Sequence, residues 1–391
     1  MIDRDHATPR ASQTVACVLT GGGRSAVAVV AIAGEKAKAI VDRYFDPAFR
    51  RTFRPGQVRY GQWVGQDDSA VATESVVITP LDDSSFEVHC HGGVAATRRI
   101  MDDLAVAGAL AIEPNQWVCG RMPPLIAEAT AVLAGCVTAR TAAIAMDQVR
   151  GALQGWATTS FDGLQQSPVS AHDVRLQAAD ILRSAVVTAR LTVPFRVVLV
   201  GPPNVGKSSL VNAIVGYDRS ITMDVAGTTR DVLHADTVID GLPIRISDTA
   251  GIRVSDEPIE REGIKRARGA AVDADLVVRV VQPGIPPLDD VVHAATIDVM
   301  NKMDTLASDS CVDQSVVGTI ATTGQGIELL MDRIVSVLTQ AMPSPGAAAA
   351  INRRQAWLIR AIAESDDAVA QTMLLQELLT PTSDHESQFD E

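Results

Sequence analysis

Residues 201–210 read GPPNVGKSSL and come directly after the apolar run FRVVLV. They match the pattern G-x-x-x-x-G-K-[ST], which lies between a buried strand and a helix and holds nucleotide phosphates. Gly201 and Gly206 let the backbone curl, so that amide hydrogens and a helix N-terminus face the phosphates. Lys207 then neutralises the β and γ oxygens, and Ser208 holds Mg²⁺. A chance match in a glycine-rich turn is the alternative, but the flanking strand and helix patterns favour a nucleotide-binding α/β domain.

Two further motifs follow in the order that such a domain needs. The stretch SDTAG places Asp248 at the carboxyl end of an apolar strand pattern, where doubly wound sheets bind ligands. A carboxylate there can hold Mg²⁺ through water, and Gly251 can offer its amide to a γ-phosphate. In the tetrapeptide NKMD, the Asp304 carboxylate can accept from the ring N–H and exocyclic amine of guanine, while Asn301 and Lys302 brace the loop. The three motifs together predict GTP rather than ATP.

The residues that would position the attacking water are less usual. Ile252 follows the D-x-x-G motif, and its side chain cannot hydrogen-bond water as the glutamine of many small GTPases does. The phosphate loop also contains no arginine. Asn204, with backbone carbonyls of the segment MDVAGTTRD, can hold a monovalent cation where an arginine finger would otherwise lie. Thr228 or Thr229 of that segment would come close to Mg²⁺ when it closes.

Length, charge and cysteine spacing restrict the class of protein. The 391 residues predict two or three domains, each with its own core. The formal net charge of −13 excludes broad nonspecific attraction to a polyanion, so any RNA contact must be a local patch. No apolar run approaches the roughly 20 residues that span a bilayer, and the polar start lacks a signal-peptide core, so we expect no membrane insertion. The scattered cysteines fit a reducing cytoplasm best. The cysteines form no C-x-x-C pair, which disfavours a disulfide framework or a zinc ribbon: Cys17, Cys90, Cys119, Cys136 and Cys311.

Secondary-structure patterns change several times along the chain. Residues 14–115 alternate short strands with amphipathic helices, whereas residues 124–191 and those after Pro345 have helical patterns with few strand signals. Residues 195–341 alternate strands and helices, which is typical of a doubly wound sheet. Within them, the dipeptide Asp240-Gly241 between two alternating apolar runs predicts a tight hairpin turn.

These patterns predict a multidomain fold: an α+β N-terminal domain, and an α-helical domain interrupted by an α/β P-loop GTPase domain. The expected parts are an N-terminal domain at 1–120, helical segments at 121–192 and 343–380, the GTPase domain at 193–342, and a disordered acidic tail at 381–391.

The chain resembles a known family in several of its motifs. GPPNVGKSSLVNAIVG, DVAGTTRD, DTAGIR, IEREGIKRA and NKMD are similar to the G domain of the bacterial tRNA-modification GTPases known as MnmE or TrmE. TGGGRSAVAVVAIAG and EVHCHGG are similar to that family's N-terminal glycine motifs. The resemblance covers nearly the whole chain and is strongest in the G domain. It implies an N-terminal domain that binds a formyl-tetrahydrofolate and forms a homodimer, a flavin-dependent partner protein, and modification at C5 of the wobble uridine of tRNA.

The resemblance also implies roles for individual residues. In the family, G domains pair across the dimer in a potassium-dependent way, and a glutamate after the D-x-x-G motif helps to position water. Asn204 would be the potassium ligand, Glu260 the glutamate, and Arg253 would lie beside the switch. On its own, Glu260 would more often be a solvated helix charge.

The candidate residues form three sets. The catalytic set is Lys207, Glu260, Arg253, Thr229 and Gly251. The nucleotide-binding set is Gly201, Asn204, Val205, Gly206, Lys207, Ser208, Ser209, Asn301, Lys302, Asp304 and Ala321. The metal ligands are Ser208, Thr229 and Asp248 for Mg²⁺, and Asn204, Met223, Val225 and Thr228 for K⁺.

The sequence departs from the family at its C-terminus. The family ends in C-x-G-K, with a cysteine implicated in the modification chemistry, whereas this sequence ends in HESQFDE. Two hypotheses follow: a potassium-activated GTPase of the tRNA-modification type, favoured by the N-terminal motifs, or a GTP-gated interaction or assembly switch without that chemistry. Under the first hypothesis, Cys90 or Cys119 is a candidate to replace the terminal cysteine.

Two weaker signals have more than one interpretation. His89, Cys90 and His91 suggest a metal site, but alternation along a strand puts the cysteine on the opposite face, and we favour a strand end beside a glycine turn. Residues 42–63 interleave arginines with aromatic residues, which fits either base stacking and phosphate contacts or a connector with buried aromatic side chains.

Overall fold

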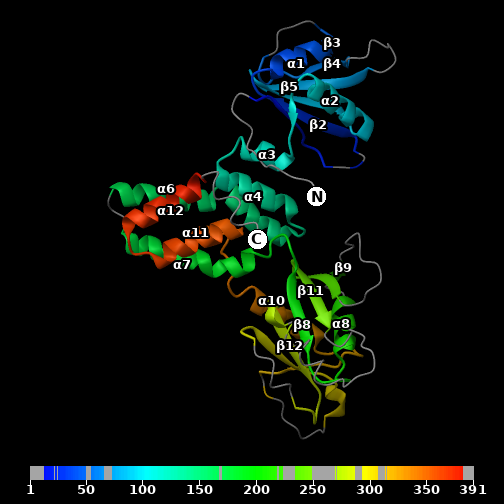
Figure 1. Ribbon diagram of the computed structural model, residues 1–391. Helices are drawn as coiled ribbons and strands as arrows, with labels where there is room; N and C mark the ends of the chain where they lie inside the picture. Colours follow the sequence, from blue (N-terminus) through cyan, green and yellow to red (C-terminus); the bar gives the residue numbers. More distant parts are fainter. Residues whose placement is uncertain are drawn as a thin grey trace. The chain divides into compact units, whose positions relative to one another are not determined.

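The computed structural model describes residues 13–21, 23, 25–49, 54–65, 73–166, 170–217, 220–222, 234–248, 269, 271–286, 293–306, 313 and 315–381. The chain divides into two compact units, Met1–Pro123 and Pro124–Glu391 (Figure 1). Apart from Pro381, the predicted acidic tail lies outside the described residues.

The first unit is a mixed sheet covered by helices. The sheet has the strand order β3-β4-β5-β6-β2-β1-β7, in which β1 and β7 are parallel and the other neighbours are antiparallel. Its strands are β1 (Val15–Val18), β2 (Val27–Ala33), β3 (Phe45–Pro47), β4 (Arg59–Trp63), β5 (Glu74–Asp82), β6 (Ser85–His91) and β7 (Leu110–Ala111). Its helices are α1 (Ala37–Tyr44), α2 (Val94–Val106) and α3 (Pro114–Cys119). Tyr44, Trp63 and Ile100 lie in its core. The predicted strands and amphipathic helices of this region are confirmed.

Helices from two distant parts of the sequence share a core in the second unit. They are α4 (Pro124–Gly135), α5 (Ala139–Val149), α6 (Ala152–Gln166), α7 (Ala171–Thr188), α11 (Arg353–Glu364) and α12 (Ala368–Leu379). Leu153 and Ile181 pack in one cluster with Leu358 and Leu375, and α7 lies along α11 while α6 lies along α12 (Figure 1). The helical patterns on both sides of residues 195–341 are confirmed. Among the described helices, none is both long enough and apolar enough to cross a membrane.

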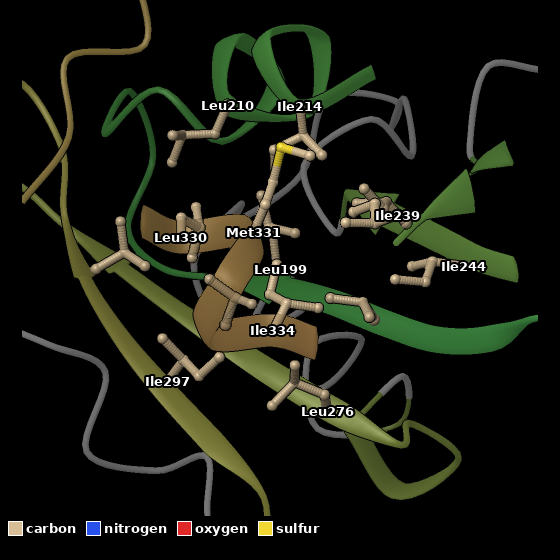
Figure 2. Close-up of a cluster of buried hydrophobic side chains, with 14 of the residues drawn as sticks. Leu199, Leu210, Ile214, Ile239, Ile244, Leu276, Ile297, Leu330, Met331 and Ile334 are labelled. Atoms are coloured by element: carbon tan, nitrogen blue, oxygen red, sulfur yellow. The ribbon is translucent and has the colours of Figure 1, made fainter. Parts of the chain in front are cut away.

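The second sheet is the doubly wound sheet that the sequence predicts. Its order is β14-β13-β12-β8-β11-β10-β9, parallel from β14 to β11, with β10 and β9 antiparallel at one edge. The strands are β8 (Phe195–Val200), β9 (Ser220–Thr222), β10 (His234–Ile239), β11 (Leu242–Asp248), β12 (Leu276–Val281), β13 (Thr296–Met300) and β14 (Val317–Gly318). The associated helices are α8 (Lys207–Val215), the 3-10 helix η1 (Met303–Thr305) and α10 (Ile327–Leu338). Figure 2 shows Leu199 of β8 packed among Leu210 of α8 and Met331 of α10.

The hairpin of β10 and β11 turns at Asp240 and Gly241. Their φ values are +48° and +73°, which is the left-handed pair that a two-residue hairpin turn of type I′ requires. The strands pair without a bulge from His234 opposite Ser247 to Ile239 opposite Leu242. Because a slip of one residue would turn the buried side chains outward, this register is well fixed. The predicted turn is confirmed.

Candidate functional site

The three sequence motifs gather at the carboxyl ends of parallel strands. The phosphate loop follows β8, Asp248 is the last residue of β11, and Asn301 follows β13. Asp248 lies in register with Leu199, near the end of β8. Strand β8 has β11 on one side and β12 on the other, so the chain path reverses direction at this point of the sheet. Ligands of open α/β sheets bind at such a reversal, which makes this edge the candidate site.

The phosphate loop depends on its two glycines. A Cβ atom on Gly201, whose φ is +157°, would lie 2.1 Å from the main-chain oxygen of Val280. Gly206, with a φ of +94°, precedes α8, and a Cβ atom there would lie 2.3 Å from Nδ2 of Asn301. Asn204 also has a left-handed φ of +65°, a conformation that asparagine tolerates better than most residues. The loop is therefore curled tightly around the N-terminus of α8.

Lys207 is buried within this loop and has a fixed position. Its residue is 5% exposed, and its Nζ donates to the main-chain oxygens of Gly201 and Pro202 at 2.8 Å each. The neighbouring Ser208 and Ser209 are exposed, whereas Val205 is fully buried and anchors the loop in the core. A positive charge and a helix N-terminus at one place form a site for a phosphate anion.

Asn301 connects the phosphate loop to the segment after β14. Its side chain is buried, and Nδ2 donates to the main-chain oxygen of Val205 at 2.9 Å. Its Oδ1 accepts from Oγ1 of Thr319 and from the main-chain N–H of Ala321, both at 3.2 Å. In the structure Asn301 therefore braces the loops through contacts with protein atoms. Sequence reasoning missed Thr319, because a threonine after a short strand matches no short motif.

The rest of the NKMD motif lies at the surface beside the phosphate loop. Nζ of Lys302 donates to the main-chain oxygen of Asn204 at 2.6 Å, and Lys302 itself has a left-handed φ of +57°. Asp304 is exposed in η1, where its carboxylate can accept hydrogen bonds from a base. The main chain of Met303 donates to the oxygen of Thr319 at 3.2 Å, which fixes η1 against the end of β14.

Several candidates fall outside what the structure describes. Seven candidates lie outside the described residues. They are the potassium ligands other than Asn204 and the switch residues: Met223, Val225, Thr228, Thr229, Gly251, Arg253 and Glu260. For Asp248 the main chain is described and the side chain is not. The structure thus brings together the phosphate loop, NKMD and the end of β11, and the roles of the remaining candidates stay predictions.

In the first unit the two glycine motifs meet. A Cβ atom on Gly92 would lie 2.1 Å from the main-chain oxygen of Ser25, so this close approach requires glycine. The two histidines of EVHCHGG pair with carboxylates: His89 Nε2 with Glu87 at 3.3 Å, and His91 Nδ1 with Glu74 at 2.6 Å. The described residues include no group of three or more His, Cys, Asp or Glu residues that could hold a metal ion.

Cys90 has the environment of a core residue. It is 4% exposed, and burial, followed by the negative charge of Glu74, raises the pKa of its thiol to about 11. A thiolate is the reactive form of cysteine, and this buried environment disfavours it, which argues against Cys90 as the replacement for a catalytic cysteine. The side chain of Cys119 lies outside the described set.

The arginine- and aromatic-rich segment 42–63 is partly core. The rings of Tyr44 and Trp63 stack with centroids 5.6 Å apart, both are buried, and Nε1 of Trp63 donates to Asp103 at 2.9 Å. These two rings are therefore not available to bases, which favours the connector interpretation at these positions. Tyr60 remains exposed.

Comparisons with known proteins match both units. Residues 14–115 match the family described as "GTP-binding protein TrmE N-terminus", and residues 196–307 match the family described as "50S ribosome-binding GTPase". A tRNA modification GTPase MnmE of Synechococcus sp. (strain JA-3-3Ab) is 30% identical over 93% of this chain and 90% of its own length. One from Roseiflexus sp. (strain RS-1) is 30% identical over 91% and 89%. With the phosphate loop and NKMD motif, these matches identify a GTP-binding and GTP-hydrolysing enzyme, and the chain belongs to the MnmE family of tRNA modification GTPases.

Proposed function

We propose that this GTPase takes part in the modification of the tRNA wobble uridine at C5. The extent of the similarity to tRNA modification GTPases carries this proposal. It covers about nine-tenths of this chain and of its Synechococcus relative, and it includes the N-terminal unit as well as the GTPase sheet. We further propose that the helical segments 121–192 and 343–380 form one domain interrupted by the GTPase domain at 193–342, after a folate-binding-like domain at 1–120.

The phosphate loop would hold GTP through its own residues. The loop amides and Lys207 bind the β- and γ-phosphates, and the narrow turns at Gly201 and Gly206 let the main chain approach them closely. Ser208, exposed at the start of α8, and Asp248, at the end of β11, are oxygen donors suited to Mg²⁺, with Thr229 as a third. When bound, Mg²⁺ would neutralise charge on the phosphate oxygens.

Guanine would be read by the NKMD motif. The exposed Asp304 accepts from the base, while Asn301 and Lys302 keep η1 and the phosphate loop in a fixed relation through their bonds to Val205 and Asn204. Because Ile252 has no polar atom in its side chain, Glu260 would position the attacking water. Gly251 would offer its amide to the γ-phosphate, and Arg253 would lie beside the switch.

Hydrolysis is expected to be about tenfold faster in potassium than in sodium at equal ionic strength. Asn204 lies in the phosphate loop with a φ of +65°, and its main-chain oxygen is engaged by Lys302, so its exposed side chain is the part that can reach a cation. Because the cation stabilises charge that grows in the transition state, its loss should lower kcat. Replacing Asn204 by glycine keeps the left-handed backbone and should remove the difference between the salts. Steady-state GTPase assays in KCl and NaCl measure both effects.

The control for this prediction is nucleotide affinity. GDP should bind Asn204→Gly within about twofold of the unmutated protein, since the loop amides and Lys207 are untouched. Equal rates in the two salts for the unmutated protein would contradict potassium activation.

We also propose that the chain acts as a homodimer that binds a formyl-tetrahydrofolate in its N-terminal domain and works with a flavin-dependent partner protein on tRNA. The match to the TrmE N-terminus supports this, as does the close approach of Gly92 to Ser25, which brings the two N-terminal glycine motifs together.

Deletion of the gene should abolish the C5 modification of wobble uridine, as measured by nucleoside mass spectrometry of total tRNA. The intact gene should restore the modification. A Lys207→Ala copy should not, because its affinity for GTP would fall about a thousandfold. Unchanged modification in the deletion strain would contradict the proposal and would favour the GTP-gated interaction or assembly switch.

A further inference from the structure

The turn between β10 and β11 is held by an arginine from the helical part of the second unit. Nη1 of Arg140, near the start of α5, donates to the main-chain oxygen of Asp240 at 2.8 Å and to its Oδ2 at 2.5 Å. Nη2 of the same guanidinium contacts Sδ of Met342, just after α10, at 3.6 Å. A Cβ atom on Gly241 would lie only 3.0 Å from Cβ of Arg140, so the glycine lets the arginine stem lie against the turn. One side chain thus joins α5 to this hairpin.

The hairpin that Arg140 contacts is paired and packed along its length. Ile239, Leu242 and Ile244 are buried in the core of the GTPase sheet, which keeps both strands in one register. At the open end, Nδ1 of His234 and Oγ of Ser247 lie 2.7 Å apart. Strand β11 then ends at Asp248, the candidate Mg²⁺ ligand. The turn that Arg140 contacts is thus joined to the phosphate edge through β11, about 20 Å long at the usual rise per residue.

The strand that leads to the phosphate loop has a separate anchor. Arg190, just after α7, donates through Nε and Nη2 to Oδ1 of Asp275 at 3.0 and 2.9 Å. Oδ2 of Asp275 accepts from the main-chain N–H of Arg196, in β8, at 2.7 Å. This pair is well shielded, with side chains 21% and 12% exposed. Loss of Arg140 therefore leaves β8 and its loop anchored to α7.

We infer that Arg140 is a positioning residue for GTP hydrolysis. Through the β10–β11 hairpin, it helps to fix the position of Asp248 relative to the phosphate loop. The inference rests on the proposed roles of Lys207 and Asp248 at the GTP site. Nucleotide affinity comes mainly from the loop that Arg190 anchors, whereas hydrolysis also needs the end of β11 in register with it. Misplacement of reacting groups by a fraction of an ångström lowers kcat more than it weakens binding.

The test compares Arg140→Ala with a matched control. Arg175→Ala removes another arginine of the helical part, whose Nε lies 2.9 Å from Oδ1 of Asp366. The Arg175 side chain is 33% exposed, against 32% for Arg140, and its ion pair does not involve the hairpin. A third variant, Asp240→Asn, removes the charge at the turn and keeps a residue that accepts a left-handed φ. For each protein, kcat and KM for GTP, the affinity for GDP and the Tm are measured.

Arg140→Ala is expected to lower kcat about fivefold and Asp240→Asn about twofold, with KM, GDP affinity and Tm nearly unchanged, while Arg175→Ala keeps the unmutated kcat. An unmutated kcat in Arg140→Ala would overturn the inference. An equal fall in Arg175→Ala would also overturn it, since any loosening of the helices would then suffice. Absence of hydrolysis in the unmutated protein would instead overturn the assignment of the GTP site, and the inference with it.

Discussion

Replacing Lys207 by alanine is expected to weaken binding of GTP and GDP about a thousandfold, or about 4 kcal/mol. The ammonium group is buried and already fixed by two main-chain oxygens of its own loop, so it loses little freedom when phosphates bind. Charge-assisted bonds in such a shielded place are stronger than exposed ones, and alanine supplies neither the charge nor the donors. Titration with a fluorescent GDP analogue measures the loss.

Lys302→Ala is the matched comparison for this prediction. It removes a second lysine from the same edge, but one that is less buried and donates to Asn204, so a loss of tenfold or less is expected. Thermal unfolding without nucleotide checks that both variants fold. Binding of GDP by Lys207→Ala with unmutated affinity would show that the 201–208 loop is not the phosphate site.

Asp304→Asn is expected to change the base preference from guanine to xanthine. Xanthine has a carbonyl where guanine has the exocyclic amine, and an amide can donate to it whereas a carboxylate cannot. Because a site built for one hydrogen-bond pattern strongly rejects the opposite one, GTP should bind about a hundredfold more weakly and xanthosine triphosphate about a hundredfold more tightly. A competition titration with the two nucleotides gives both values.

Asp273→Asn serves as the control, because this exposed aspartate precedes β12 at the opposite end of the sheet. It should leave both affinities unchanged. If Asp304→Asn kept the unmutated affinity for GTP, the NKMD motif would not contact the base, and the choice of GTP over ATP would need another explanation.

Local features of the site were predictable from the sequence. The glycines at 201 and 206 and the Asp240-Gly241 turn follow from backbone conformations that few other residues adopt, and the structure gives these residues positive φ values. Apolar patterns likewise located β8, β11 and α8, because each element buries one face or both.

Contacts between distant segments were not predictable in this way. Nothing in NKMD shows that Asn301 would bond to Val205 and Thr319 at once, or that Arg140 would reach a turn 100 residues away. Such contacts depend on the path of the whole chain. The same limit applies to Cys90, a candidate from the sequence to replace the terminal cysteine, because its burial depends on helices packed over the face of β6.

The helical core shared by α7 and α11 has a consequence for synthesis on the ribosome. Helices α4–α7 emerge before α11 and α12. Their apolar residues that pack with Leu358 and Leu375 have no partner until residues 189–352 have been translated. At the usual elongation rates this takes about 10 to 30 s. The nascent chain therefore carries an unpaired apolar surface while the GTPase sheet forms, and this interval is when a chaperone would bind it. Once the sheet has folded, it brings the ends of the two segments together, where Thr188 donates to the main-chain oxygen of Ala350.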